Sequence, residues 1–362
     1  MLTEHQTAQL DLLSDNEPAS NQFNPFDKVK SVTICGQELE VSPVFSAYWY
    51  FAAERQAIFF NRLNRFNRQD LTRDPILSTF KFTNAYRASD RVSQYLIKNV
   101  IYRNDLPQSR DELFFRIMLF KIFNKIETWE LFERSFGTPS LSSFSVEQYS
   151  KLLCDAMLQG DRIYSAAYIM PSAGSVFGHK SKHANHLALL RWMLDQAMPS
   201  KLASFEMMAQ GFHEILSVPS FGPFLAYQYI TDLNYSQLTN FEESEFVVAG
   251  PGALDGISKC FTKTEKIPPE EIIQFMFDNQ ERYFDELNLE FQTLWGRKLQ
   301  LIDCQNIFCE ISKYARVAFP DVGGLAGRKR IKQKYRAGET LPEPFYPPDW
   351  DINSEIERTL LS

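Results

Sequence analysis

Cysteine is scarce in this sequence, and its copies stand singly along the chain. The five are Cys35, Cys154, Cys260, Cys304 and Cys309. An odd number without paired spacing excludes a disulfide framework, a four-thiolate metal site and an iron–sulfur cluster. We therefore expect a reduced, cytoplasmic protein with no bound metal and no cofactor.

Long apolar runs and an apolar leader are also missing, so neither a membrane span nor a signal peptide is expected. Positive charge is not in excess, because the formal net charge is −7. Nucleic-acid binding through general positive charge is therefore excluded, and any such contact needs a local patch. One candidate patch holds six cations, although a solvated tail explains it equally well. These are Arg328, Lys329, Arg330, Lys332, Lys334 and Arg336.

Apolar residues spaced three or four apart dominate residues 45–235, which predicts amphipathic helices. Only residues 31–35 have the composition of a strand. We therefore expect an all-α fold with one small β element near the N-terminus. The expected organisation is a disordered leader at 1–25, a helical domain at 26–200, a second domain at 201–340 and a C-terminal tail at 341–362.

A tight turn between two expected helices reads Val-Pro-Ser-Phe-Gly-Pro at residues 218–223. Backbone N–H groups of such a turn, with the N-terminus of the second helix, can hold a DNA phosphate. An ordinary turn between helices is the alternative. The stretch resembles the helix-hairpin-helix of DNA-repair glycosylases, with Ser220 in place of the first glycine. The resemblance implies DNA contacts from Ser220, Phe221, Gly222 and Phe224.

Residues 301–316 resemble a second segment of these glycosylases, in which an Asp at a helix start faces the hairpin. The resemblance makes Asp303 the catalytic carboxylate, with Gln305 or Asn306 orienting substrate or water. A fixed carboxylate stabilises the cationic sugar that forms when an N-glycosidic bond breaks. Helix capping by Asp303 is the structural alternative, and both roles can coexist. Residues 235–300 separate the two segments, so an inserted subdomain is required.

Residues 74–91, 247–260 and 301–316 resemble the helical domain of 5-hydroxymethyluracil DNA kinases and the related α-glutamyl-putrescinyl thymine pyrophosphorylases. These families are related to the helix-hairpin-helix glycosylases, including phage-restriction glycosylases that act on glucosylated hydroxymethylcytosine. Polar side chains in this stretch suit a pocket for a flipped base. A buried Arg–Asp network that braces helices is equally well supported. The candidate pocket residues are Asn84, Tyr86, Arg87, Asp90 and Arg91.

Two other patterns are weaker. The Gly-rich stretch at residues 174–181 resembles a phosphate-binding loop, but its glycines are one residue too close and His179 interrupts the Gly-Lys pair. A P-loop kinase is therefore not expected. A metal site at His179, His183 and His186 lacks an acidic or thiol ligand nearby in the sequence.

The favoured hypothesis from the sequence is a monofunctional DNA glycosylase, a hydrolase that flips and excises a modified base in antiviral defence. Phe224 stands where lyase-type members carry a Schiff-base lysine, so excision should stop at an abasic site. The expected partner is double-stranded DNA, with no membrane and a monomer favoured. One alternative is a transferase that adds an amine or amino acid to a pyrophosphorylated hydroxymethyl pyrimidine. The other is a non-catalytic DNA-binding module.

Overall fold

The computed structural model describes residues 26, 28–63, 71–336 and 341–361. Helices dominate this part of the chain, and one two-stranded sheet lies near the N-terminus. The expected all-α fold with a small β element is confirmed. The leader expected at residues 1–25 lies outside the described residues. None of the described helices is both long enough and apolar enough to cross a membrane.

The small sheet is a tight hairpin of β1 (Ser31–Ile34) and β2 (Gln37–Glu40). Its two turn residues, Cys35 and Gly36, have positive φ angles of 49° and 74°. Turns of this kind match the twist of the strands that they join. The hairpin packs beside α14 (Pro269–Asp278) and so closes one end of the helical core.

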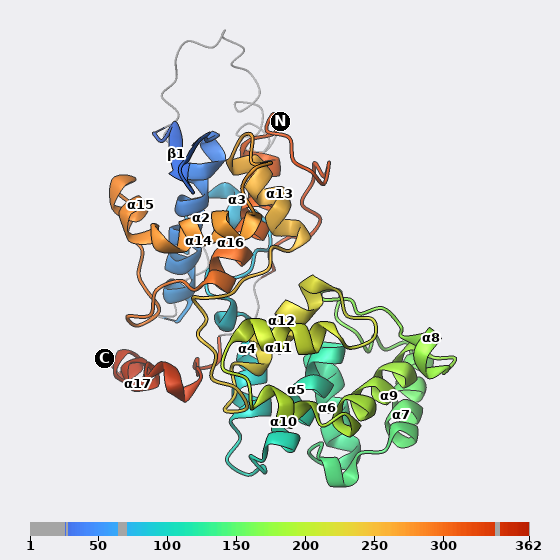
Figure 1. Ribbon diagram of the computed structural model, residues 1–362. Coiled ribbons are helices and arrows are strands. Elements are labelled where there is room, and N and C mark those ends of the chain that lie inside the picture. The colour runs from blue at the N-terminus through green and yellow to red at the C-terminus, as the bar shows by residue number, and fades with distance from the viewer. Residues whose placement is uncertain (1–25, 27, 64–70, 337–340, 362) are drawn as a thin grey trace, which may run out of the picture.

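One group of helices surrounds α16 (Leu301–Ala318) and fills the upper half of Figure 1. Helix α13 (Pro251–Cys260) lies so close to α16 that a Cβ atom at Gly256 would come within 2.1 Å of the Phe308 carbonyl oxygen. Only glycine permits this approach. The other members are α2 (Pro43–Leu63), α3 (Pro75–Thr79), α14 and α15 (Gln280–Glu286).

A second group packs around α5 (Arg110–Phe123) in the lower half of Figure 1. The sequence-based boundary at residue 200 runs through this group, because helices from both sides of it contact α5. Likewise, α2 from the expected first domain packs on α13 and α16. The expected domain limits therefore do not follow the packing. The other members are α6 (Ile126–Phe136), α7 (Val146–Leu158), α8 (Gly174–Phe177), α9 (Lys182–Asp195), α10 (Met198–Leu202), α11 (Met208–Leu216) and α12 (Pro223–Leu233).

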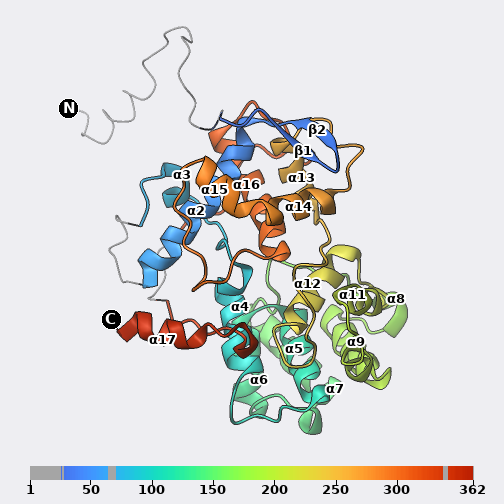
Figure 2. The same ribbon diagram turned by 60° about the vertical axis from the view of Figure 1, so that its left-hand side comes forward.

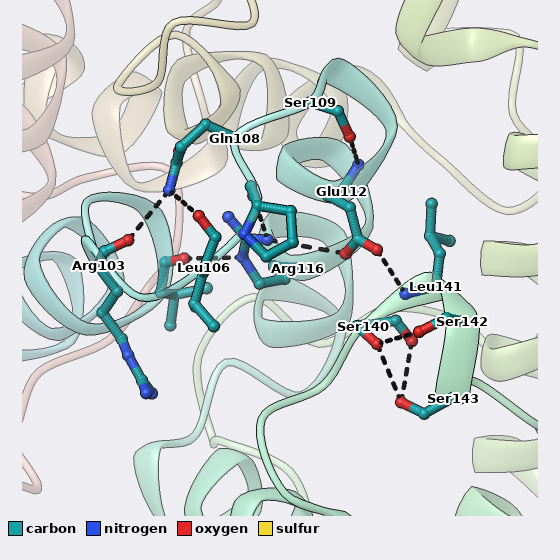
Figure 3. A network of polar contacts seen from close by, with 12 residues as sticks. Arg103, Leu106, Gln108, Ser109, Glu112, Arg116, Ser140, Leu141, Ser142 and Ser143 are labelled. Carbon is teal, nitrogen blue, oxygen red and sulfur yellow. Dashed lines mark hydrogen bonds and ion pairs between the residues drawn. The ribbon is translucent and has the colours of Figure 1, made fainter.

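Between the groups run the short 3-10 helix η2 (Arg87–Ser89), α4 (Arg91–Tyr95) and the π-helix η3 (Leu96–Ile101). A π-helix is rare and leaves carbonyl groups that need partners from outside. The buried Arg116 side chain on α5 (Figure 3) supplies one such partner, because it donates to the Val100 carbonyl of η3 at 3.1 Å. It also donates to the Pro107 carbonyl, beyond the end of η3, at 2.8 Å. This network holds α4 and η3 in a fixed position against α5.

The C-terminal segment, residues 341–361, runs along the junction of the two groups (Figures 1 and 2). Tyr346 is fully buried, and its hydroxyl lies 2.7 Å from the Ser89 hydroxyl. The Gln94 side chain donates to the Phe345 carbonyl and accepts from the Phe345 N–H. The segment therefore packs on η2 and α4 and stabilises their positions through these hydrogen bonds. It ends in η5 (Pro348–Trp350) and α17 (Asn353–Leu361).

Candidate functional site

The turn before η2 is held by side chains from several helices. Asn84 accepts from the Arg55 guanidinium of α2 at 2.8 Å and donates to the Ser89 carbonyl at 2.7 Å. The Asn84 N–H donates to the Asp90 carboxylate at 2.9 Å. Glu310 on α16 accepts from the Thr83 N–H at 3.1 Å. This part of the predicted pocket is therefore a rigid turn between the two helix groups.

Arg87 enters a buried polar cluster between η2, α5 and α12. Its guanidinium lies 2.5 Å from the Asp232 carboxylate, which also pairs with the Lys121 ammonium group. All three side chains are at most 3% exposed. Burial alone would raise the pKa of Asp232, but the two cations hold it below its ordinary value. Burial lowers the pKa of Lys121 to about 8, so the cluster carries one surplus positive charge at neutral pH.

A cavity of about 400 Å³ opens beside this cluster. Arg87, Lys121 and Asp232 line its buried part, and Tyr168 forms another part of its wall. The Lys121 ammonium nitrogen lies 4.2 Å from the centre of the Tyr168 ring. The volume falls within the range of small-molecule pockets in proteins, about 300–1,000 Å³. The cavity therefore offers an aromatic surface and a cationic end to one ligand group.

A larger groove of about 960 Å³ adjoins the cavity and shares Lys81, Asp90 and Arg91 with it. The basic C-terminal stretch forms one wall, because its backbone pairs with that of residues 79–81. The Lys81 N–H donates to the Gln333 carbonyl at 3.0 Å, and the Tyr335 N–H donates to the Thr79 carbonyl at 2.9 Å. The cations that line the groove are Arg55, Arg62, Lys81, Arg91, Lys332, Lys334 and Arg336. Two sequence features far apart in the chain thus form one basic surface.

The structure brings together only some of the predicted residues. Arg87, Asp90 and Arg91 line the cavity, and Asn84 lines the groove. Tyr86 is buried, and its hydroxyl donates to the Arg297 carbonyl at 2.6 Å. Three residues of the predicted basic patch, Lys332, Lys334 and Arg336, line the groove. The remaining residues of the predicted pocket and patch, which line neither the cavity nor the groove, are Gln305, Asn306, Arg328, Lys329 and Arg330.

Asp303 lies in the first turn of α16 and is 4% exposed. One carboxylate oxygen accepts from the Arg87 N–H at 2.7 Å, and the other accepts from the Gln300 N–H at 3.0 Å. Burial outweighs these hydrogen bonds and raises the pKa of Asp303 to about 7. The carboxylate lines neither the cavity nor the groove. Its observed role is the alternative one, a helix cap that also holds η2.

The predicted hairpin joins α11 to α12, and Ser220 adopts a positive φ of 73°. Ser220 therefore takes the conformation that glycine would adopt more readily at this turn. Gly222 caps α12, and the Phe221 ring packs edge-on against Tyr229. Phe224 stacks on Tyr168 with ring centres 6.0 Å apart, which connects the hairpin to the cavity wall. DNA contacts by these hairpin residues stay a prediction.

The weaker sequence patterns find no supporting geometry. The Gly-rich stretch forms the four-residue helix α8, and both strands of the described chain lie far from it in the sequence. His183 contacts Cys154, whereas His186 lies between the Tyr164 hydroxyl and the Pro171 carbonyl. Within the described ranges, no group of three or more His, Cys, Asp or Glu side chains could hold a metal ion.

Sequence reasoning missed Lys121 and Asp232. Both stand within apolar helical patterns, Phe-Lys-Ile on α5 and Thr-Asp-Leu on α12. A charge on an otherwise buried helix face needs a partner, because an unpaired buried charge is costly. The presence of two such charges of opposite sign, one on each helix, was therefore the sequence signal that could have identified a buried ion pair.

Comparison with known proteins assigns the family. The family described as "5-hmdU DNA kinase, helical domain" matches residues 42–324. A curated relative, the 5-hmdU DNA kinase of Bacillus phage SP10, is 24% identical over 309 residues. That alignment covers 80% of this chain and 48% of the relative, so the chain spans about half the relative's length. No solved structure matches significantly.

These findings correct the hypothesis drawn from the sequence. The relative is named a kinase, which is a transferase, so the expectation of a glycosylase and hydrolase is wrong. The transferase alternative is closer to the finding. The resemblance carried by residues 74–91 is confirmed, since the family match includes them. By the extent of that match, the chain belongs to the family of the 5-hmdU DNA kinase helical domain.

Proposed function

We propose that this chain binds DNA that contains a 5-hydroxymethylated pyrimidine and serves group transfer at the hydroxymethyl group of that base. DNA lies along the basic groove, and the modified base enters the adjoining cavity. The observation that carries the proposal is that Lys81, Asp90 and Arg91 line both the groove and the cavity. The name of the phage relative supports this choice of base.

The charges of the two spaces support this arrangement. Seven Lys and Arg side chains line the groove with Asp90 as its carboxylate, although the chain as a whole carries a net charge of −7. Such a local concentration of cations suits DNA phosphates. In the cavity, the surplus charge of the Arg87, Lys121 and Asp232 cluster suits a phosphoryl group bound to the hydroxymethyl oxygen. We place this activity in the cytoplasm, the compartment expected from unpaired cysteines.

The test compares two DNA duplexes that differ at one base, thymine or 5-hydroxymethyluracil. Fluorescence anisotropy at fixed salt measures the dissociation constant of each. We expect the modified duplex to bind at least ~10-fold more tightly, since a site that hydrogen-bonds a hydroxyl rejects an analogue without it. Equal affinities would refute recognition of the modified base.

Mass spectrometry of the nucleosides after incubation with ATP and Mg²⁺ tests the chemistry. A nucleoside that is heavier by a phosphoryl group supports group transfer. Release of the free base would contradict it. An unchanged nucleoside would restrict this chain to binding the modified DNA.

A further inference from the structure

Asp90 occupies the point where the cavity and the groove meet, and it lines both. One of its carboxylate oxygens accepts from the Asn84 N–H at 2.9 Å. Among the described residues, its other oxygen has no hydrogen-bond donor and no cation within 4.0 Å. Asp232, the second carboxylate of the cavity, is fully engaged by Arg87 and Lys121. The second carboxylate oxygen of Asp90 is thus able to accept a hydrogen bond from a ligand in the cavity.

The position of Asp90 is unfavourable for binding DNA phosphates alone, because an anion among cations weakens their attraction. The Asp90 carboxylate is still mainly ionised at neutral pH, although its surroundings raise its pKa. Burial raises the pKa of Asp90 to about 6, and Glu310 on α16 acts in the same direction. The Asn84 N–H, Arg55 on α2 and Arg87 on η2 oppose this rise. The phenols of Tyr168 and Tyr346 also interact with Asp90. The cations Lys81, Arg91 and Lys121 line the same cavity.

We propose that Asp90 determines specificity by accepting a hydrogen bond from the hydroxyl of the base's hydroxymethyl group. This inference rests on the proposed function, in which the base enters the cavity. The methyl group of thymine has no hydrogen-bond donor. Thymine would therefore exclude water from the Asp90 carboxylate without supplying a hydrogen bond in its place. A buried acceptor left unpaired in this way disfavours the wrong ligand.

The substitution Asp90→Asn tests the proposal because the amide has the same shape. Its carbonyl oxygen still accepts from the Asn84 N–H, while its NH₂ group replaces the free acceptor with a donor. We expect the ratio of affinities for 5-hydroxymethyluracil and thymine duplexes to fall at least ~10-fold. Lys332→Gln is the control. Lys332 lines the groove but not the cavity, so its loss should weaken binding of both duplexes equally and leave the ratio unchanged.

A second measurement needs no variant. For the wild-type protein at constant salt, the affinity ratio should be high at pH 8 and decline below about pH 6, where Asp90 becomes protonated. A ratio that stays constant from pH 8 to well below that value would overturn the role of Asp90. This result also decides the matter if Asp90→Asn does not fold.

The outcomes separate this inference from the proposed function. If the wild-type protein prefers the modified duplex and Asp90→Asn keeps that preference, Asp90 does not read the hydroxyl and the proposed function stands. If the wild-type protein has no preference, the proposed function fails and the inference fails with it.

Discussion

Arg87 and Asp232 form a buried ion pair, 2.5 Å between Nη1 and Oδ1, that connects the turn at η2 to α12. Lys121 shares the same carboxylate from α5. One anion therefore neutralises one of two cations and holds together three elements from different parts of the sequence. The other cation's charge is available to a ligand in the cavity.

Asp232→Asn should lower the free energy of unfolding by about 3–5 kcal/mol, because it leaves two buried cations without their anion. Urea unfolding followed by circular dichroism measures the change. A loss below about 1 kcal/mol, the range of an exposed pair, would show that water reaches the cluster.

Lys121→Met is the matched comparison, since it leaves the Arg87 and Asp232 pair neutral. We expect its unfolding free energy at pH 7 to stay within about 1 kcal/mol of wild type. The pKa of Lys121 is lowered to about 8, so the unfolded chain binds a proton more readily between pH 8 and its ordinary value of 10.5. Wild-type stability should therefore gain with rising pH in that window, and Lys121→Met should lack the gain.

The raised pKa of Asp303 predicts that the free energy of unfolding falls, rather than rises, with increasing pH. Its pKa is raised from 3.8 to about 7, so the folded protein holds a proton that the unfolded chain releases in this range. The stability that this group contributes is complete below pH 3.8 and is lost as the pH rises to about 7. Asp303→Asn should remove this loss. Urea unfolding of both proteins across the range measures it, and parallel pH profiles would contradict the assignment.

Neutralising groove cations should weaken DNA binding without changing base preference. We expect Lys332→Gln and Lys334→Gln each to lower affinity for thymine and 5-hydroxymethyluracil duplexes alike. The slope of log affinity against log salt should fall by about one unit per lost phosphate contact. Lys151→Gln is the control, because the Lys151 side chain is exposed on α7 and lies outside the groove. If it weakened binding as much as the groove variants, the groove would not be the DNA path.

The close packing of α13 on α16 predicts two different responses to alanine. Gly256→Ala places a methyl group against the Phe308 backbone, which cannot yield, so we expect a loss of about 3 kcal/mol or more. At Gly252 the new Cβ would meet the Cys309 side chain at 2.9 Å. The double variant Gly252→Ala with Cys309→Ala should therefore recover much of the stability lost in Gly252→Ala alone. Thermal unfolding measures the stability of each variant. If Cys309→Ala did not restore stability to Gly252→Ala, the steric clash would not be with the Cys309 side chain.

Much of the fold was predictable because its causes are local. Apolar spacing predicted the helices, and the strand-like residues 31–35 fall on β1 and its turn. Asp90 and Arg91 were predicted as pocket residues because of their polar side chains, and both line the cavity. The helix cap at Asp303 was also an explicit alternative, and it is observed.

The remainder depends on tertiary contacts that no local pattern encodes. Nothing in residues 79–81 indicates pairing with residues 333–335, yet this pairing builds the groove wall. Packing between distant segments is likewise not visible in the sequence, because α2 contacts α13 and α16 only in the folded chain. The glycosylase hypothesis failed differently, because it rested on a resemblance of Asp303 and the hairpin to another family, whereas the relative is named a kinase.

The backbone pairing at residues 333–335 has a practical consequence for dissecting the protein. The family match ends at residue 324, before this strand-like wall and before Tyr346. A fragment cut at the limits of the match would retain Arg87, Lys121 and Asp232 but lose the groove wall at residues 332–336 and the contact of Tyr346 with Ser89. The limits of the family match are thus narrower than the smallest unit expected to bind DNA, and fragments for binding studies should extend through α17.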